Sequence, residues 1–234
     1  RNVNQDYVYA KLDDIGCLPN LFIVADGMGG HKAGDTASRY TVETLVELLK
    51  ESEGKDPLAT IDNNIKLVNS LLLRKAGESE EYNGMGTTLV VASIFDNTLR
   101  VANVGDSRLY VIQDGIRQVT RDHSLVQEMV RFGGISREQA RIHPDRNIIT
   151  RAVGVEDDLQ VDLFLVPLEG KDRVLLCSDG LTGMLEDEEI LQILEGEGNV
   201  EERAQRLVQA ANDHGGRDNI AVIIMEPFSD EVSG

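Results

Sequence analysis

Four aspartates stand beside small residues at the boundaries of predicted strands: Asp26, Asp106, Asp179 and Asp218. Each one alone is typical of a turn, because Asp and Gly both favour turn conformations. Together they indicate a metal-binding or catalytic site. An Asp-Gly pair at a strand end, such as Asp26 and Gly27, exposes a carboxylate and a backbone carbonyl oxygen with a fixed orientation. Mg²⁺ and Mn²⁺ prefer oxygen ligands of these kinds. The sequence therefore predicts a site for a hard divalent cation.

Residues for zinc or thiol chemistry are sparse. The chain has four histidines and two cysteines, and these show no spacing typical of a zinc site. A cysteine-dependent phosphatase needs an arginine six residues after its reactive cysteine, but Ile23 and Gly183 occupy those positions after Cys17 and Cys177. Cys177 lies in an apolar run, which is typical of a buried, reduced thiol and predicts a cytoplasmic setting.

Composition argues against two classes of partner. The formal net charge of −18 opposes binding to nucleic acid, because such binding rests largely on Lys and Arg. The longest apolar runs fall far short of the roughly 20 residues that a membrane-spanning helix needs, so we expect no membrane segment. With 234 residues and 41% hydrophobic content, the chain can bury the core of one large domain, which we expect to cover residues 1–234.

Periodic apolar patterns predict the elements that position the aspartates. Strands are predicted over 7–11, 21–25, 87–95, 99–104, 108–113, 160–166, 173–178 and 220–225, and helices over 34–50, 58–75, 187–194 and 200–213. Short turns join 87–95, 99–104 and 108–113, so we expect these three strands to be antiparallel neighbours. Hairpin-linked strands flanked by pairs of helices predict an α+β fold, two packed antiparallel β-sheets with helices outside (an α-β-β-α sandwich). An irregular insert is predicted at about 127–150, and such inserts often shape a binding surface.

Seven short motifs follow one another along nearly the whole chain. They are RNVNQD (1–6), VADGMGGH (24–31), GTT (86–88), NVGDSR (103–108), TRDHS (120–124), CSDGL (177–181) and GRDN (216–219). In this order they resemble the motifs of the metal-dependent protein phosphatases, the protein phosphatase 2C family, in its bacterial form. One such motif is a weak signal, whereas seven in register are specific. The resemblance implies hydrolysis of phosphoserine and phosphothreonine in other proteins.

The resemblance also implies which residues hold metal. Asp26 would bridge two tightly bound ions, Mn²⁺ or Mg²⁺, and the Gly27 carbonyl would hold the second of them. Asp179 and Asp218 would complete the first. Two ions about 3.5 to 4 Å apart can activate a bridging water or hydroxide for in-line attack on phosphorus, with no phosphoenzyme. The same ions would offset the negative charge of the substrate.

Three further residues receive roles from the resemblance. Asp6 would hold metal-bound water. Arg1 would bind the substrate phosphate, because the planar donors of a guanidinium bind phosphate oxygens in pairs. The alternative is that Arg1 is only a solvated terminal side chain. Asp106 matches the ligand of a third, weaker ion, and its alternative is a turn carboxylate in a surface ion pair with Arg108.

One position departs from part of the family. Some relatives, notably eukaryotic ones, have a histidine directly after the first Asp-Gly, where it is discussed as the acid for the leaving group, and this chain has Met28. His31 is near in sequence, but bracing of the glycine turn is its favoured role. Metal-bound water is the other candidate for the acid. The insert at about 127–150 matches the family's variable flap, where substrate selection is expected.

The implied partners are phosphorylated proteins, including the substrates of a Ser/Thr protein kinase and the kinase itself, and we expect a monomer. The main rival is a catalytically silent phosphatase-like binding module, because folds can outlive activity. The presence of Asp26, Asp179 and Asp218 argues against it. A metal-dependent nuclease or phosphodiesterase is the second rival, and the acidic charge disfavours it.

Overall fold

The structure of the chain is a computed structural model that describes residues 3–228. Its elements are, in order, β1 (Asp6–Lys11), β2 (Leu21–Met28), α1 (His31–Lys50), α2 (Pro57–Ala76), the short 3₁₀ helix η1 (Glu80–Tyr82), β3 (Gly86–Thr87), β4 (Leu89–Phe95), β5 (Thr98–Val104), β6 (Arg108–Ile112), β7 (Ile116–Gln118), α3 (Leu125–Arg131), α4 (Arg137–Ile142), β8 (Asp162–Pro167), β9 (Arg173–Cys177), α5 (Asp179–Thr182), α6 (Asp187–Glu195), α7 (Val200–Asp213) and β10 (Val222–Met225).

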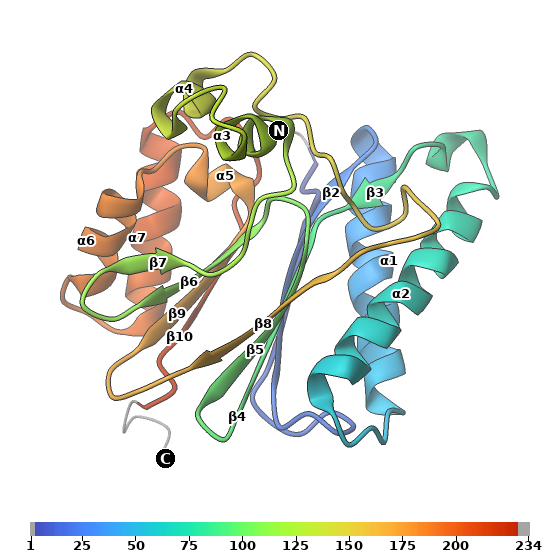
Figure 1. The fold of residues 1–234 in the computed structure, drawn as a ribbon, viewed down its shortest axis with the longest axis horizontal. Helices are drawn as coiled ribbons and strands as arrows, with labels where there is room; N and C mark the ends of the chain where they lie inside the picture. The colour runs from blue at the N-terminus through green and yellow to red at the C-terminus, as the bar shows by residue number, and fades with distance from the viewer. Residues whose placement is uncertain (1–2, 229–234) are drawn as a thin grey trace.

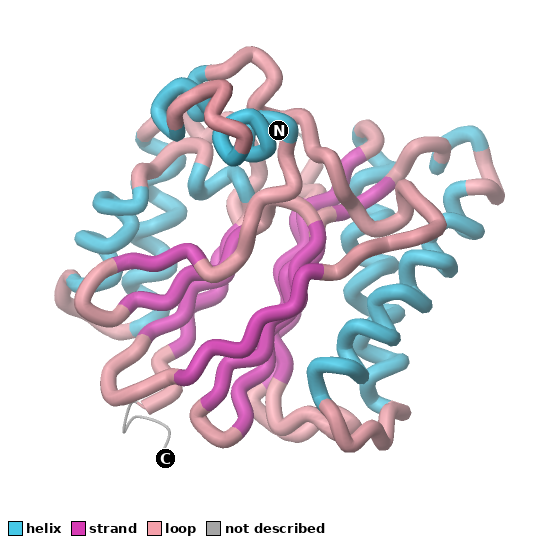
Figure 2. The backbone as a smooth tube through the Cα atoms, in the orientation of Figure 1, coloured by secondary structure: helices cyan, strands magenta, loops and turns pink. Residues whose placement is uncertain are grey.

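The strands form two antiparallel sheets that pack face to face (Figures 1 and 2). The first sheet has the order β1-β2-β4-β5-β8, with β3 paired to β2, and the second has the order β10-β9-β6-β7. Helices α1 and α2 cover the outer face of the first sheet, and α6 and α7 cover the outer face of the second (Figure 1). The predicted α-β-β-α sandwich is confirmed.

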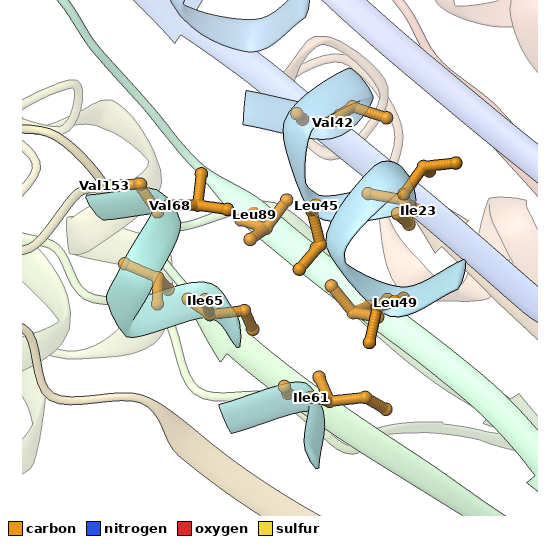
Figure 3. Close-up of a cluster of buried hydrophobic side chains, with 14 of the residues drawn as sticks. Ile23, Val42, Leu45, Leu49, Ile61, Ile65, Val68, Leu89 and Val153 are labelled. Carbon is orange, nitrogen blue, oxygen red and sulfur yellow. The ribbon is translucent and has the colours of Figure 1, made fainter. Parts of the chain in front are cut away.

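Central strands are mainly apolar because both of their faces are buried. Successive side chains of a strand point to opposite faces, so in β2 Ile23 packs toward the helices while Phe22 and Val24 join the core between the sheets. Figure 3 shows Ile23 and Leu89 beside Leu45 of α1. Burying a side chain of this size stabilises the fold by roughly 1.5 to 3 kcal/mol. A one-residue slip of β2 would exchange the two faces, so its register is strongly specified.

The predicted pairing of strands 99–104 and 108–113 is wrong. Strand β5 pairs with β4 and β8, whereas β6 pairs with β7 and β9 in the other sheet. The chain changes sheets at Gly105, which has a φ of +102° and lies so close to Thr88 that a Cβ would come within 2.7 Å of its side chain. Both strands are mainly apolar, so their local pattern does not determine which sheet each one joins. Asp114 and Gly115, a residue pair typical of hairpin turns, lie in the hairpin that joins β6 to β7.

The irregular insert contains α3 and α4, which lie over one end of the sandwich near α5 (Figure 1). Hydrogen bonds close its base, because Leu125 N donates to Ile148 O at 2.9 Å and Thr150 N donates to His123 O at 2.8 Å. Arg141 of α4 donates to Thr182 O of α5 at 3.2 Å. Within residues 3–228, no helix is long and apolar enough to cross a membrane.

Candidate metal centre

A cavity of about 610 Å³ opens at the end of the sandwich where β2 ends and α5 begins. Its lining includes Asp26, Gly27, Asp179 and Asp218, which come from three distant stretches of the sequence. The fold thus brings these four predicted ligand residues together. Met28 also lines the cavity, so the position directly after the first Asp-Gly faces this space.

Strand pairing places Asp6 beside Asp26, since the two are direct cross-strand partners of β1 and β2. Asp26 lies inside β2, which runs on to Met28, whereas the sequence predicted that the strand ends at residue 25. Thr88 holds Asp26 in place, because Asp26 N donates to Thr88 Oγ1 at 2.9 Å and Thr88 N donates to Asp26 O at 2.8 Å. Pairing on both sides fixes the backbone that carries the Asp26 carboxylate.

Two glycines let other segments approach the proposed ligands closely. A Cβ on Gly27 would lie 1.9 Å from Gly34 O in α1, and a Cβ on Gly180 would lie 1.8 Å from Asn219 O. Only glycine fits at either position without displacing backbone. The contact at Gly180 brings the start of α5 against the segment that carries Asp218.

Burial and mutual repulsion act on the carboxylates of the centre. Burial, followed by repulsion from Asp6 and Asp179, raises the pKa of Asp26 to about 10. Burial is also the largest cause for Asp6, whose pKa is raised to about 6, and for Asp106, whose pKa is raised to about 8 with a contribution from Asp179. These carboxylates disfavour each other's ionisation, and a cation bound among them would stabilise their ionised forms.

The donor set fits a divalent cation with oxygen ligands. Asp6 Oδ1 is buried and accepts no hydrogen bond within the part of the chain that the structure describes. Among these same residues, no group of three or more His, Cys, Asp or Glu side chains is arranged to hold a metal ion by itself. Mg²⁺ and Mn²⁺ sites commonly use one or two carboxylates and complete their shells with carbonyl oxygens and water. The arrangement therefore matches an open site of carboxylates with the Gly27 carbonyl.

The alternative for Asp106, an ion pair with Arg108, is wrong. Arg108 binds Asp122 instead, with 3.0 Å between Nε and Oδ1 and 2.7 Å between Nη2 and Oδ2. Asp106 is buried in the turn between β5 and β6, where the charge of Asp179 raises its pKa and the charge of Arg108 lowers it. This location is consistent with a role beside the centre, and the third-ion role stays a prediction.

Two predicted residues fall outside what the structure describes. Arg1 precedes residue 3, and the side chain of His31 is not described. Their roles stay predictions. Thr88 and Ser178, for which no role was predicted from the sequence, hold Asp26 and Asp6 by hydrogen bonds. The available signal was a hydroxyl residue at the edge of an otherwise apolar strand.

Comparison with known proteins identifies the family of this chain. The family model described as Protein phosphatase 2C matches residues 1–223. This chain belongs to the protein phosphatase 2C family. It is 45% identical over 211 residues to the serine/threonine phosphatase stp of Listeria innocua, covering 88% of this chain and 84% of that protein. It is 38% identical to the protein phosphatase PhpP of Streptococcus pneumoniae, covering 96% and 92% of the two chains.

Solved structures share the fold. The serine/threonine phosphatase Stp1 of Staphylococcus aureus superposes with a TM-score of 0.91 at 38% identity, covering 98% of this chain and 91% of that one. The catalytic domain of the phosphatase PstP, solved in complex with two manganese ions, has a TM-score of 0.84 at 35% identity, covering 97% and 92%. The chain is thus a metal-dependent protein serine/threonine phosphatase, and the catalytic interpretation is supported over the silent binding module.

Proposed function

We propose that this phosphatase hydrolyses phosphoserine and phosphothreonine at the cavity where Asp26, Gly27, Asp179 and Asp218 meet. The observation that carries the proposal is the convergence of these residues in one cavity. We propose two tightly bound ions, Mn²⁺ or Mg²⁺, and a third, weaker ion at Asp106. The two manganese ions of the PstP complex support the proposal of two tightly bound ions, since that domain shares the fold.

The residues of the centre divide into three tasks. Asp26 would bridge the two ions, the Gly27 carbonyl would bind one, and Asp179 and Asp218 would bind the other. When bound, the ions supply Lewis acidity that activates water for attack on phosphorus and offsets phosphoryl charge. Asp6 Oδ1, which is buried with no partner among residues 3–228, would accept a hydrogen bond from water at the centre.

Substrate binding and proton donation involve other residues. Arg1 would bind the substrate phosphate with the paired donors of its guanidinium. Met28 lines the cavity but has no proton to donate, so the leaving-group acid is not at that position. We propose that the flap at about 127–150 contacts the protein part of the substrate, because it lies over the same end of the sandwich (Figure 1).

The biological setting follows from the reaction. Phosphorylated proteins are the substrates, and we propose a Ser/Thr protein kinase as the source of the phosphate and as one of the substrates. We also propose that the chain acts as a monomer, as one catalytic domain over residues 1–234, in the cytoplasm. Two free cysteines, Cys17 and the buried Cys177, support a reducing compartment.

The test is release of phosphate from phosphothreonine, phosphoserine and phosphotyrosine peptides with added Mn²⁺. We expect release from the first two peptides and little from the third. An Asp26→Asn preparation, purified in the same way, controls for contaminating phosphatases and should release almost none. Equal release by the variant and the parent chain would contradict the assignment of the site.

Asp106→Ala should leave two tightly bound Mn²⁺ ions in place and lower turnover by about 10- to 100-fold, the range typical of residues that support a metal site. Extra Mn²⁺ should not restore the rate fully, because the side chain that would hold the third ion is absent. Calorimetric counting of bound Mn²⁺ and steady-state rates on one preparation check this. A normal rate with unchanged stoichiometry would make Asp106 structural, and a joint fall in melting temperature and occupancy would indicate a damaged turn.

Alkylation of cysteine should leave turnover unchanged. Cys177 is fully buried, and burial raises the pKa of its thiol to about 12, so iodoacetamide should not reach it in the folded protein. Cys17 is only partly buried, packs against the core between the first sheet and its helices, and does not line the cavity of the centre. Mass spectrometry should show modification at Cys17 alone, with the same rate before and after. Loss of activity in a protein that remains folded would contradict an oxygen-only site.

A further inference from the structure

Ser178 forms hydrogen bonds that fix the direction of its hydroxyl. The side chain is fully buried, its Oγ donates to Asp6 Oδ2 at 2.7 Å, and it accepts from Ala221 N at 2.9 Å. A serine hydroxyl has a single proton. Because the backbone N–H of Ala221 can only donate, that proton is committed to the carboxylate of Asp6.

The contacts of Ser178 join three segments that carry proposed site residues. Asp6 lies on β1 in the first sheet, and Asp179 directly follows Ser178 at the end of β9 in the second sheet. Ser178 N also donates to Ala221 O at 3.1 Å, which anchors the segment just after Asp218. One buried hydroxyl therefore bridges the two sheets at the centre.

The bond to Ser178 distinguishes the two oxygens of Asp6. Oδ2 is engaged by the hydroxyl, whereas Oδ1 is buried and accepts no hydrogen bond from residues 3–228. Without the hydroxyl, Oδ2 would lose the donor that fixes it, and the direction of the carboxylate would be less restricted. A carboxylate that orients water needs a fixed acceptor direction, so the hydroxyl acts on the reaction through Asp6.

We propose that Ser178 is a positioning residue for the phosphatase reaction, which holds Asp6 through Oδ2 so that Oδ1 stays available to water at the centre. The same hydroxyl sets the spacing between Asp6 and the Asp179 and Asp218 segments. This inference rests on the proposed function, because it takes these three aspartates as residues of the metal centre.

Ser178→Ala should weaken Mn²⁺ binding and lower kcat, each by about 10- to 100-fold, as loss of a group that orients a metal site usually does. The KM for a phosphothreonine peptide should change little, because neither Ser178 nor Asp6 is proposed to contact the peptide. Titration calorimetry with Mn²⁺ measures binding without reference to activity. Ser178→Thr, which keeps the hydroxyl, should recover part of the Mn²⁺ affinity.

A double-mutant cycle tests whether Ser178 acts through Asp6. In an Asp6→Ala background, Ser178→Ala should have almost no further effect on Mn²⁺ affinity, because the group that it positions is gone. If Ser178→Ala weakened Mn²⁺ binding by the same factor in both backgrounds, the inference would be overturned. This comparison stays informative when Ser178→Ala also lowers the melting temperature.

Ser93→Ala is the matched control. Ser93 is also fully buried in a strand, and its hydroxyl donates to Asn20 Oδ1 at 3.4 Å, away from the centre. It should leave Mn²⁺ affinity unchanged. An Asp179→Asn variant distinguishes a failure of the proposed function from a failure of the Ser178 proposal. Normal Mn²⁺ binding by Asp179→Asn would contradict the proposed function, whereas loss there with normal binding by Ser178→Ala would contradict this inference alone.

Discussion

Replacing Asp179 or Asp218 by Asn is expected to lower turnover on a phosphothreonine peptide by at least about 100-fold, since losing a mere supporting partner of a metal ligand already costs about 10- to 100-fold. An amide oxygen is a weaker ligand than a carboxylate, and the amide NH₂ would present protons where an ion needs electron pairs. Both residues line the same cavity. Steady-state rates at saturating Mn²⁺ and calorimetric Mn²⁺ counting measure the effect.

Asp172→Asn is the matched control for Asp179→Asn. Asp172 is buried just before β9, at the opposite end of the strand from Asp179, and its Oδ2 accepts from Glu169 N at 2.8 Å. The variant should lower the melting temperature without changing the number of bound ions or the rate per folded molecule. A near-normal rate in Asp179→Asn or in Asp218→Asn would remove that residue from the centre.

Chelation of divalent ions should reduce phosphate release to the rate of the uncatalysed background and should make stability depend on pH. Burial raises the pKa of Asp6 to about 6 and that of Asp106 to about 8 in the ion-free fold, from an ordinary value of 3.8. Their raised pKa values mean that the folded chain keeps protons that the unfolded chain has lost. The contribution of these two carboxyls to stability is therefore full below about pH 4 and is lost as the pH rises from there toward their folded pKa values.

The expected size of this effect follows from proton linkage. Each pH unit over which one such carboxyl stays protonated only in the fold lowers the free energy of unfolding by about 1.4 kcal/mol. A change of about 1.4 kcal/mol corresponds to roughly 3 to 6 °C in melting temperature for a chain of this size. Melting curves between pH 5 and 8, with chelator and with Mn²⁺, measure it. Added Mn²⁺ should flatten the dependence, because it stabilises the ionised carboxylates, and equal slopes with and without Mn²⁺ would contradict a metal site at these residues.

The two long helices and most strand positions could be predicted because their signals are local. Apolar residues at helical spacing gave 34–50 and 58–75, and the structure extends these only to His31–Lys50 and Pro57–Ala76. The end of β2 could not be predicted. Gly27 and Met28 lack a strand pattern, but they pair with Thr87 and Gly86, and a partner far along the chain decides whether they are extended.

The sequence by itself determined which residue types could form the centre, their order along the chain and the layered α+β architecture, because turn chemistry and periodicity are properties of neighbouring residues. Only the tertiary structure decided that β6 joins the second sheet, that Arg108 binds Asp122 rather than Asp106, and that Ser178 binds Asp6. These are contacts between segments separated in sequence. Their energies depend on burial and on close approach in three dimensions, which no local pattern encodes.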